Sequence, residues 1–256
     1  MLFEIPKDIT DYLGELDAFI EREIKPIQAR DDNERFFDHR REHARTDWDN
    51  DGLPRHEWEE LLREMYRVAD AAGHYRFAIP EEFGGKNGSN LAMAVIRHHL
   101  AAKGLGLHND LQNESSIVGN LVQVLMLRDF GTEQQKRDFI PQMLAGKMRW
   151  AFGLTEENHG SDATHMDTRA VPEVRDGVAG YRIDGNKMWT TGLHVATHVM
   201  TFARTNGEDG KARGITCFVV PTDAPGARLP AAATVTAPAI VPVPPRVPAL
   251  TVVRPV

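Results

Sequence analysis

The chain has 256 residues, of which 41% are hydrophobic and 26% are charged, the usual balance of a globular protein with a buried core. Its 30 Lys and Arg against 37 Asp and Glu leave a net charge of −7, which argues against a general binder of nucleic acid or of anionic membranes. The sequence has no apolar run of about 18 residues and no secretory signal at its start, so we expect a cytoplasmic protein without a transmembrane helix.

The first 146 residues have the apolar spacing of α-helices. The predicted helices cover 9–24, 54–73, 91–107, 117–130 and 133–144. Pro26 is expected to close the first helix and Gly73 to end the second, and Thr132 is the expected N-cap of the last. A glycine-rich turn is predicted over 80–90.

From Trp150 onward, short apolar or alternating runs replace the helical spacing. They predict strands over 150–154, 170–174, 181–183, 199–203 and 215–220. The turns between them read D-G, D-G-N and N-G-E-D-G, which is hairpin chemistry. This part is therefore predicted to be an antiparallel β domain.

These patterns predict an α+β chain in three parts. An all-α domain spans 1–146, and a small antiparallel β domain, barrel-like or a sandwich, spans 147–226. Residues 227–256 contain seven Ala, seven Pro and seven Val and no acidic residue, so we expect an irregular or disordered tail. Its abrupt onset suggests that the native reading frame is lost shortly after Gly226.

Two patterns resemble metal-binding sites, but an ordinary structural role explains each of them better. Asp47, Asp49 and Asp51 match the first ligands of a calcium loop, but Trp58 stands where a bidentate glutamate is needed. We therefore prefer a polar turn before the second helix. The pairs His39/His43 and His194/His198 have i,i+4 spacing without the H-E-x-x-H signature, so no metal is expected.

Other common chemical signatures are missing from the sequence. The sequence contains neither G-x-x-x-x-G-K-[ST] nor G-x-G-x-x-G, the two glycine-rich phosphate-binding motifs. The nucleophile motif G-x-S-x-G is also absent. The single cysteine, Cys217, is interpreted as a buried apolar residue in a strand rather than a reactive thiol.

Two segments remain as candidates for a ligand site. In the first, 150–162, a strand runs into a loop where Thr155, Gly160 and Ser161 can offer hydroxyl and backbone N–H groups to an anion or a heteroaromatic edge. The alternative is that these are ordinary turn residues between strands.

The second segment, 184–192, is predicted to be a turn into a short strand that displays Trp189 beside Thr190 and Thr191. An indole beside hydroxyl groups suits a flat ring system with polar edges. A core tryptophan is the competing interpretation.

Together these segments resemble the acyl-CoA dehydrogenase family. T-E-E-N-H-G-S-D is similar to the family's T-E-P-x-x-G-S-D loop, and G-N-K-M-W-T-T-G to its G-x-K-x-W-I-T-N-G strand. Three further motifs follow the family's order: I-P-E-E-F-G-G, F-G-T-E-Q-Q-K with L-A-G-K, and R-G-I-T-C-F-V-V-P. The resemblance spans most of residues 1–226. Glu157, Thr190 and Gly192 depart from the family's proline, isoleucine and asparagine.

The resemblance implies an FAD site. Its residues would be Phe152, Leu154, Thr155, Gly160, Ser161, Trp189, Thr190 and Thr191. In the first segment, Leu154 and Thr155 would lie against the isoalloxazine edge, with Gly160 and Ser161 near the pyrophosphate. Ser161 would also touch the acyl-CoA.

In the second segment, Trp189 would pack on the flavin while Thr190 and Thr191 bond its ring atoms. The implied reaction is α,β-dehydrogenation of an acyl-CoA thioester, with electron-transfer flavoprotein as acceptor and a homo-oligomer as the assembly. The family's base is a glutamate of a C-terminal helical bundle, which we expect this truncated chain to lack. No residue is therefore assigned as catalytic, and the chain alone is expected to be weakly active or inactive.

Two alternatives remain open at this point. The chain could be a non-catalytic acyl-CoA or protein-binding module that keeps two domains of the fold. It could also be an acyl-CoA oxidase or nitroalkane oxidase relative, and the sequence does not indicate the acyl chain length.

Overall fold

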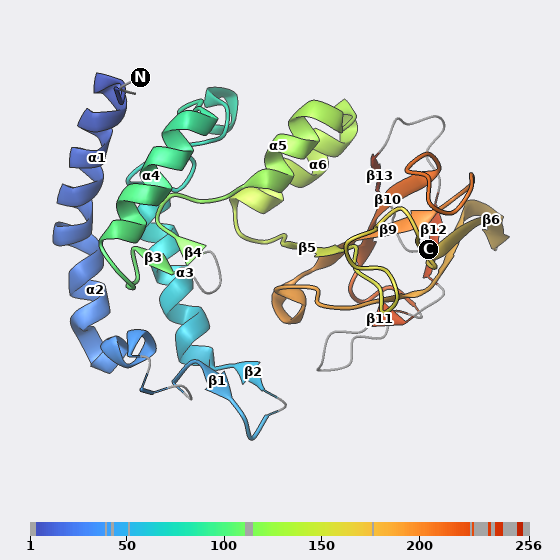
Figure 1. Cartoon of the computed structure of the whole chain (residues 1–256), viewed down its shortest axis with the longest axis horizontal. Coiled ribbons are helices and arrows are strands. Elements are labelled where there is room, and N and C mark those ends of the chain that lie inside the picture. The colour runs from blue at the N-terminus through green and yellow to red at the C-terminus, as the bar shows by residue number, and fades with distance from the viewer. Residues whose placement is uncertain are drawn as a thin grey trace. The chain divides into compact units, whose positions relative to one another are not determined.

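The computed structural model of the chain consists of two compact units, Met1–Val122 and Gln123–Val256 (Figure 1). It describes residues 4–38, 40–41, 44–50, 52–110, 115–175, 177–225, 227, 235–236, 239–242 and 250–252. Within this described part, no helix combines the length and the apolar character that crossing a bilayer requires.

Helices form most of the first unit. Its elements are α1 (Lys7–Phe19), the π-helical turn η1 (Ile20–Ile24), α2 (Lys25–Ala29), the 3-10 helix η2 (Arg30–Phe37), β1 (Thr46–Asp47), β2 (Leu53–Pro54), α3 (His56–Ala71), the 3-10 turn η4 (Glu81–Phe83), α4 (Asn90–Ala102), β3 (Asn109–Asp110) and β4 (Ser115–Ser116). Leu16 of α1, Met65 of α3 and Ile96 of α4 are fully buried in one shared core. These three helices lie side by side in Figure 1.

The prediction that Pro26 closes the first helix is wrong. The helical path continues through η1 into α2, which ends at Ala29. A proline cannot donate to the carbonyl one turn earlier, and its ring crowds that carbonyl. Here Pro26 occupies the first turn of α2 directly after a π-helical turn, and such a turn is one way in which a helix accommodates an irregularity.

Two other helices begin later than predicted. Pro54 belongs to β2, and α3 starts at His56; the predicted stop at Gly73 is confirmed, because this glycine has a φ of 77°. The helix predicted from residue 117 starts at Val122. Before it, the amide of Ile117 donates to the carbonyl of His108 over 3.1 Å, which keeps this stretch in the β3–β4 hairpin instead of a helix.

In its described part, the second unit combines α-helices with a seven-stranded sheet and a two-stranded sheet of β8 and β11. Its elements are α5 (Val122–Phe130), α6 (Glu133–Leu144), β5 (Trp150–Gly153), β6 (Arg169–Arg175), β7 (Val178–Asp184), β8 (Asn186–Lys187), the 3-10 turn η5 (Leu193–Val195), β9 (His198–Arg204), β10 (Ile215–Pro221), β11 (Val235–Thr236), β12 (Ala239–Pro242) and β13 (Leu250–Val252). All five predicted strands are confirmed, as β5, β6, β7, β9 and β10. The predicted order of a helical part followed by a sheet is also confirmed.

The sheet is mixed rather than antiparallel. Its order is β12-β7-β6-β9-β10-β13, with β5 also paired to β9. The hairpin pairs β6–β7 and β9–β10 are antiparallel, as their turns predict, but β5–β9 and β10–β13 are parallel. Hairpin turns fix the pairing of consecutive strands only, and β5 meets β9 after three other strands have intervened.

Several larger-scale predictions are not tested by these observations. The domain boundaries at 146 and 226 and the barrel-like closure of the sheet stay predictions. The irregular tail is not confirmed: its described residues include the short strands β11, β12 and β13. The rest of that segment lies outside the described residues.

The N-cap predicted for α6 is confirmed. The Thr132 hydroxyl accepts from the Gln135 amide over 3.2 Å, and the Gln135 side chain accepts from the Thr132 amide over 2.8 Å, which completes a capping box. We expect Thr132→Ala to lower the free energy of unfolding by about 1 kcal/mol, because the Gln135 amide at the helix start loses the hydroxyl to which it donates. Urea unfolding followed by circular dichroism measures this. Thr132→Ser keeps the hydroxyl, so an equal loss in that variant would contradict the role of the cap.

Candidate functional site

Strands β5 and β6 lie one after the other along the same edge of β9. The parallel pairing of β5 brings Gly153 opposite Thr201, and β6 meets β9 where Arg169 lies opposite Arg204. The other edge of β9 is fully occupied by β10. Residues 154–168, which we call the site loop, therefore leave the sheet and return to it at neighbouring points of one strand.

The two ends of the site loop are joined by the carboxylate of Glu156. One oxygen, Oε2, accepts from the amide of Asp167 over 2.6 Å. The other, Oε1, accepts from the amide of Thr168 over 3.0 Å and from the Thr168 hydroxyl. Backbone N–H groups at the loop's end thus bind a side chain at its start, which closes the neck of the loop.

Lys187 of β8 completes this arrangement. Its Nζ lies 2.6 Å from Glu156 Oε1 and donates to the Leu154 carbonyl over 3.1 Å. The residues of this ion pair are only 1% and 5% exposed. Two glycines allow the close packing, because a Cβ on Gly185 would lie 2.2 Å from Thr168 Oγ1, and one on Gly153 would lie 2.9 Å from a methyl of Val199.

The surroundings of Glu156 keep its carboxylate ionised. Burial alone would raise its pKa, but hydrogen bonds from Lys187 and Thr168 outweigh that effect and the pKa is lowered. A carboxylate with this many donors is held in place and is a poor acceptor for a substrate proton. Glu156 is therefore a structural anchor of the loop.

The second candidate segment lies directly beside the first. The amide of Met188 donates to the Thr155 carbonyl over 2.9 Å, which places Trp189 next to the start of the site loop. Trp189 has a φ of 58°, a left-handed conformation that non-glycine residues adopt at a cost, and is 77% exposed. Phe152 of β5 is also 51% exposed, and its ring packs on Phe202 with 5.0 Å between the ring centres.

The two threonines that follow Trp189 differ in their surroundings. Thr191 is exposed, whereas Thr190 is buried, and among the described residues its hydroxyl has no hydrogen-bond partner. The Thr190 hydroxyl is therefore not presented to a ligand on the exposed side of this segment. This burial fits the apolar isoleucine that the family resemblance leads us to expect at the position.

The remaining predicted residues lie in the site loop. Leu154 and Thr155 are half-buried at its start, and Gly160 and Ser161 are exposed. A Cβ on Gly160 would meet no atom within 4 Å, so the backbone here is open to an approaching group. The structure thus brings Thr155 and Trp189 together and leaves Gly160 and Ser161 accessible in the outer part of the loop.

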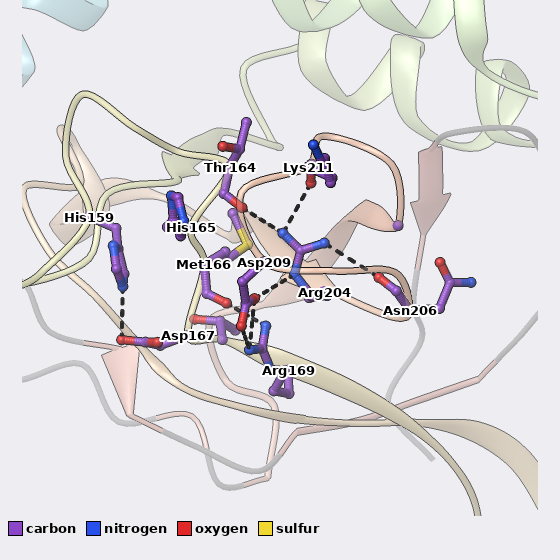
Figure 2. A network of polar contacts seen from close by, with 12 residues as sticks. His159, Thr164, His165, Met166, Asp167, Arg169, Arg204, Asn206, Asp209 and Lys211 are labelled. Atoms are coloured by element: carbon purple, nitrogen blue, oxygen red, sulfur yellow. Dashed lines mark hydrogen bonds and ion pairs between the residues drawn. The ribbon is translucent and has the colours of Figure 1, made fainter.

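A second set of contacts fastens this outer part to the turn between β9 and β10 (Figure 2). Arg204, at the end of β9, is buried and donates to the Thr164 carbonyl over 2.6 Å and to the Lys211 carbonyl over 3.1 Å. Asp209 lies 3.1 Å from Arg204 and also accepts from Arg169 over 2.9 Å. The site loop is therefore held at its neck by Glu156 and further out by Arg204.

Sequence reasoning missed Glu156, Lys187 and Arg204 as residues that shape the site. A partial signal existed for the first two, because the first motif carries the acidic residues Glu156, Glu157 and Asp162 and the second carries a lysine. No comparable signal existed for Arg204, because most of its partners are backbone carbonyls, which every residue type supplies.

In the part of the chain that the structure describes, no three His, Cys, Asp or Glu side chains gather in a way that could hold a metal ion. His39, His43 and Asp51 lie outside the described residues. Cys217 is buried, and burial raises the pKa of its thiol to about 12, which agrees with the interpretation as an apolar strand residue.

Comparison with known families supports the resemblance found in the motifs. The profile described as "Acyl-CoA dehydrogenase, N-terminal domain" matches residues 28–147. The profile described as "Acyl-CoA dehydrogenase, middle domain" matches residues 151–239 and so contains the site loop, β8 and Arg204.

Similar curated proteins carry related names. The probable acyl-CoA dehydrogenase FadE10 of Mycobacterium tuberculosis is 37% identical over 154 residues, which cover 60% of this chain and 23% of that protein. Acyl-CoA dehydrogenase FadE26 of the same organism is 31% identical over 65% of this chain and 39% of its own length. The L-prolyl-[peptidyl-carrier protein] dehydrogenase of Pseudomonas fluorescens is 29% identical over 64% and 42%. The matched stretch therefore spans less than half the length of these relatives.

Solved structures agree with the fold. Glutaryl-CoA dehydrogenase from Mycobacterium smegmatis in complex with FADH2 has a TM-score of 0.60 at 25% identity, covering 93% of this chain and 54% of that chain. The ChsE4-ChsE5 complex from Mycobacterium tuberculosis has a TM-score of 0.63 at 22% identity, covering 94% and 56%, and supports the fold alone. With both family profiles matched in order and the fold shared, this chain belongs to the acyl-CoA dehydrogenase family.

Proposed function

We propose that this chain carries the FAD-facing part of an enzyme that dehydrogenates acyl-CoA thioesters between the α and β carbons. The observation that carries the proposal is Trp189, a largely exposed indole held in a left-handed conformation beside the site loop. Covering apolar surface stabilises a complex by about 25 cal/mol per Å². A flat ring system that stacked on this indole would therefore gain binding energy.

The donor set around Trp189 fits the flavin. Phe152 adds a second exposed aromatic surface, and the exposed Thr191 offers a hydroxyl for a polar ring edge. Leu154 and Thr155 would lie against the isoalloxazine edge. Thr190 would contribute its backbone N–H, since its side chain is buried.

The outer part of the site loop fits the phosphate-bearing part of the ligand. Gly160 and Ser161 are exposed, and exposed backbone N–H and hydroxyl groups suit an anion. Gly160 and Ser161 would bind near the FAD pyrophosphate, and Ser161 would also contact the acyl-CoA. The FADH2 bound to the related glutaryl-CoA dehydrogenase supports the choice of a flavin.

When bound, FAD would supply the acceptor for the hydride that leaves the β carbon. The chain's own residues would stack against the ring, orient it and hold the loop closed around its edge. Glu156, the acid of the T-E motif, is not proposed as the base that removes the α-proton, because its carboxylate is paired with Lys187. We assign this role to none of the described residues. The proposed partners are an acyl-CoA substrate, electron-transfer flavoprotein and further copies of the chain.

The stacking role of Trp189 gives a direct test. We expect Trp189→Ala to raise the dissociation constant for FAD about tenfold, because aromatic stacking on a ring is worth about 1–3 kcal/mol. Equilibrium titration with FAD, followed by flavin fluorescence, measures this. Trp48→Ala is the matched control, since Trp48 is also exposed but belongs to the first unit. Equal weakening in both variants, or no FAD binding by the unaltered chain, would refute the proposal.

The neck of the loop gives a second test. Removing one partner of a buried ion pair leaves an uncompensated charge, so Glu156→Gln and Lys187→Met should each cost about 3–5 kcal/mol of unfolding free energy. The double variant should lose less than the sum of the two. Glu173→Gln, which breaks the half-buried pair with Arg182 at the surface of the sheet, should cost less than about 1 kcal/mol. Additive losses would show that Glu156 and Lys187 do not act as a pair.

The same pair predicts a pH dependence. The folded pKa of Glu156 is lower than the unfolded value, so its stabilising contribution is complete above the unfolded value and is lost as pH falls through the folded one. The stability difference between the unaltered chain and Glu156→Gln should therefore shrink as pH falls from 7 to below 4. Urea unfolding at several pH values measures it, and a constant difference would contradict the lowered pKa.

A further inference from the structure

The outer half of the site loop, residues 157–166, depends on contacts that differ from those at its neck. It contains no helix or strand. The two reciprocal backbone bonds between Glu156 and His159, both 3.3 Å, and the 3.3 Å contact of His159 with Asp167 hold only its first part. The second part, which returns to β6, is held by bonds from Thr164 and His165 to Asp162, by the Gly210 amide, which donates to the Thr164 carbonyl over 3.1 Å, and by two arginines.

Arg204 is the centre of these contacts, as Figure 2 shows. Its two terminal nitrogens donate to four carbonyls, those of Thr164, Asn206, Lys211 and Arg213, over 2.6 to 3.4 Å. One of these carbonyls belongs to the loop and three belong to the turn between β9 and β10. The planar fork of a guanidinium can serve several acceptors at once, which a lysine ammonium cannot do in the same geometry.

Asp209 connects this group to a second arginine. Its carboxylate lies 3.1 Å from Arg204 Nε, within ion-pair distance, and accepts from Arg169 Nη2 over 2.9 and 3.0 Å. Hydrogen bonds from Arg169 contribute most to lowering the pKa of the Asp209 carboxyl. Arg169 in turn donates to the Met166 carbonyl. The two arginines therefore fix two carbonyls of the returning half-loop, at Thr164 and Met166.

Burial decides how Arg204 acts. Only 5% of the residue is exposed, so its guanidinium cannot reach a phosphate on the surface of the loop. Its effect must pass through the backbone that it fixes. A loop that is ordered before binding spares the ligand the entropy cost of ordering it, and this raises affinity without a new contact.

We propose that Arg204 and Asp209 are positioning residues that pre-order the outer half of the site loop and thereby set its affinity for the phosphate-bearing part of FAD. The inference rests on the proposed function, because it takes Gly160 and Ser161 as the groups that face the pyrophosphate. Riboflavin, which carries the same ring system without any phosphate, separates the two parts of the ligand.

The experiment compares FAD and riboflavin binding to the full chain and to three variants, Arg204→Met, Arg204→Lys and Asp209→Asn. We expect Arg204→Met to weaken FAD about tenfold and riboflavin less than twofold. Asp209→Asn should weaken FAD to a smaller extent, and Arg204→Lys should restore part of the affinity. Arg182→Met is the control, since the ion-pair partners of Arg182, Glu173 and Asp184, belong to β6 and β7 of the same sheet and not to the loop.

Hydrogen exchange of the ligand-free variants gives a second readout. Faster exchange confined to residues 157–166 and the turn at 205–214 in Arg204→Met supports the proposal. Unchanged FAD affinity in Arg204→Met, or equal loss of FAD and riboflavin, overturns it. If Arg204→Met fails to fold, the same comparison with Arg204→Lys and Asp209→Asn decides. If the unaltered chain binds neither FAD nor riboflavin, the proposed function is refuted. If the unaltered chain binds FAD and the variants bind it equally well, only the role of Arg204 and Asp209 is refuted.

Discussion

The buried ion pair between Glu156 and Lys187 is the interaction on which the site depends. Desolvating two charges costs several kcal/mol each, and this is offset only when hydrogen bonds satisfy both groups. Here the carboxylate binds the end of the site loop and the ammonium binds the Leu154 carbonyl. The need to satisfy one buried pair therefore draws together the start of the loop, its end and β8, which are far apart in the sequence.

The pairing of β5 and β6 with the same strand explains why such a clamp is needed. Both strands lie along one edge of β9, so the site loop between them is long but its two ends are close together. Closing it costs little, but ordering each of its residues costs about 1–2 kcal/mol of conformational free energy. Glu156 at the neck and Arg204 further out supply contacts that offset this cost without occupying the exposed surface at Gly160 and Ser161.

Sequence reasoning located the elements and the motifs but not the contacts that shape them. Five strands and most helices follow from local periodicity and turn chemistry, which is why β5, β6, β7, β9, β10 and the cap at Thr132 were predictable. The parallel pairing of β5 with β9 and the carbonyl partners of Arg204 depend on tertiary contacts that no local pattern encodes. The burial of Thr190 was missed for the same reason, since the sequence does not indicate whether a threonine beside Trp189 is buried or donates to a ligand.

Trp189 shows how these contacts relate to function. A non-glycine residue in a left-handed conformation costs about 1–2 kcal/mol. Because the indole of Trp189 is largely exposed, hydrophobic burial does not offset this cost. The arrangement persists because Met188 is bound to Thr155, and Lys187 beside it is locked to Glu156. The clamp that closes the loop therefore also fixes the backbone from which the indole projects. A ring system that stacked there would meet a residue on an ordered backbone, so its binding energy would not be spent on ordering that segment.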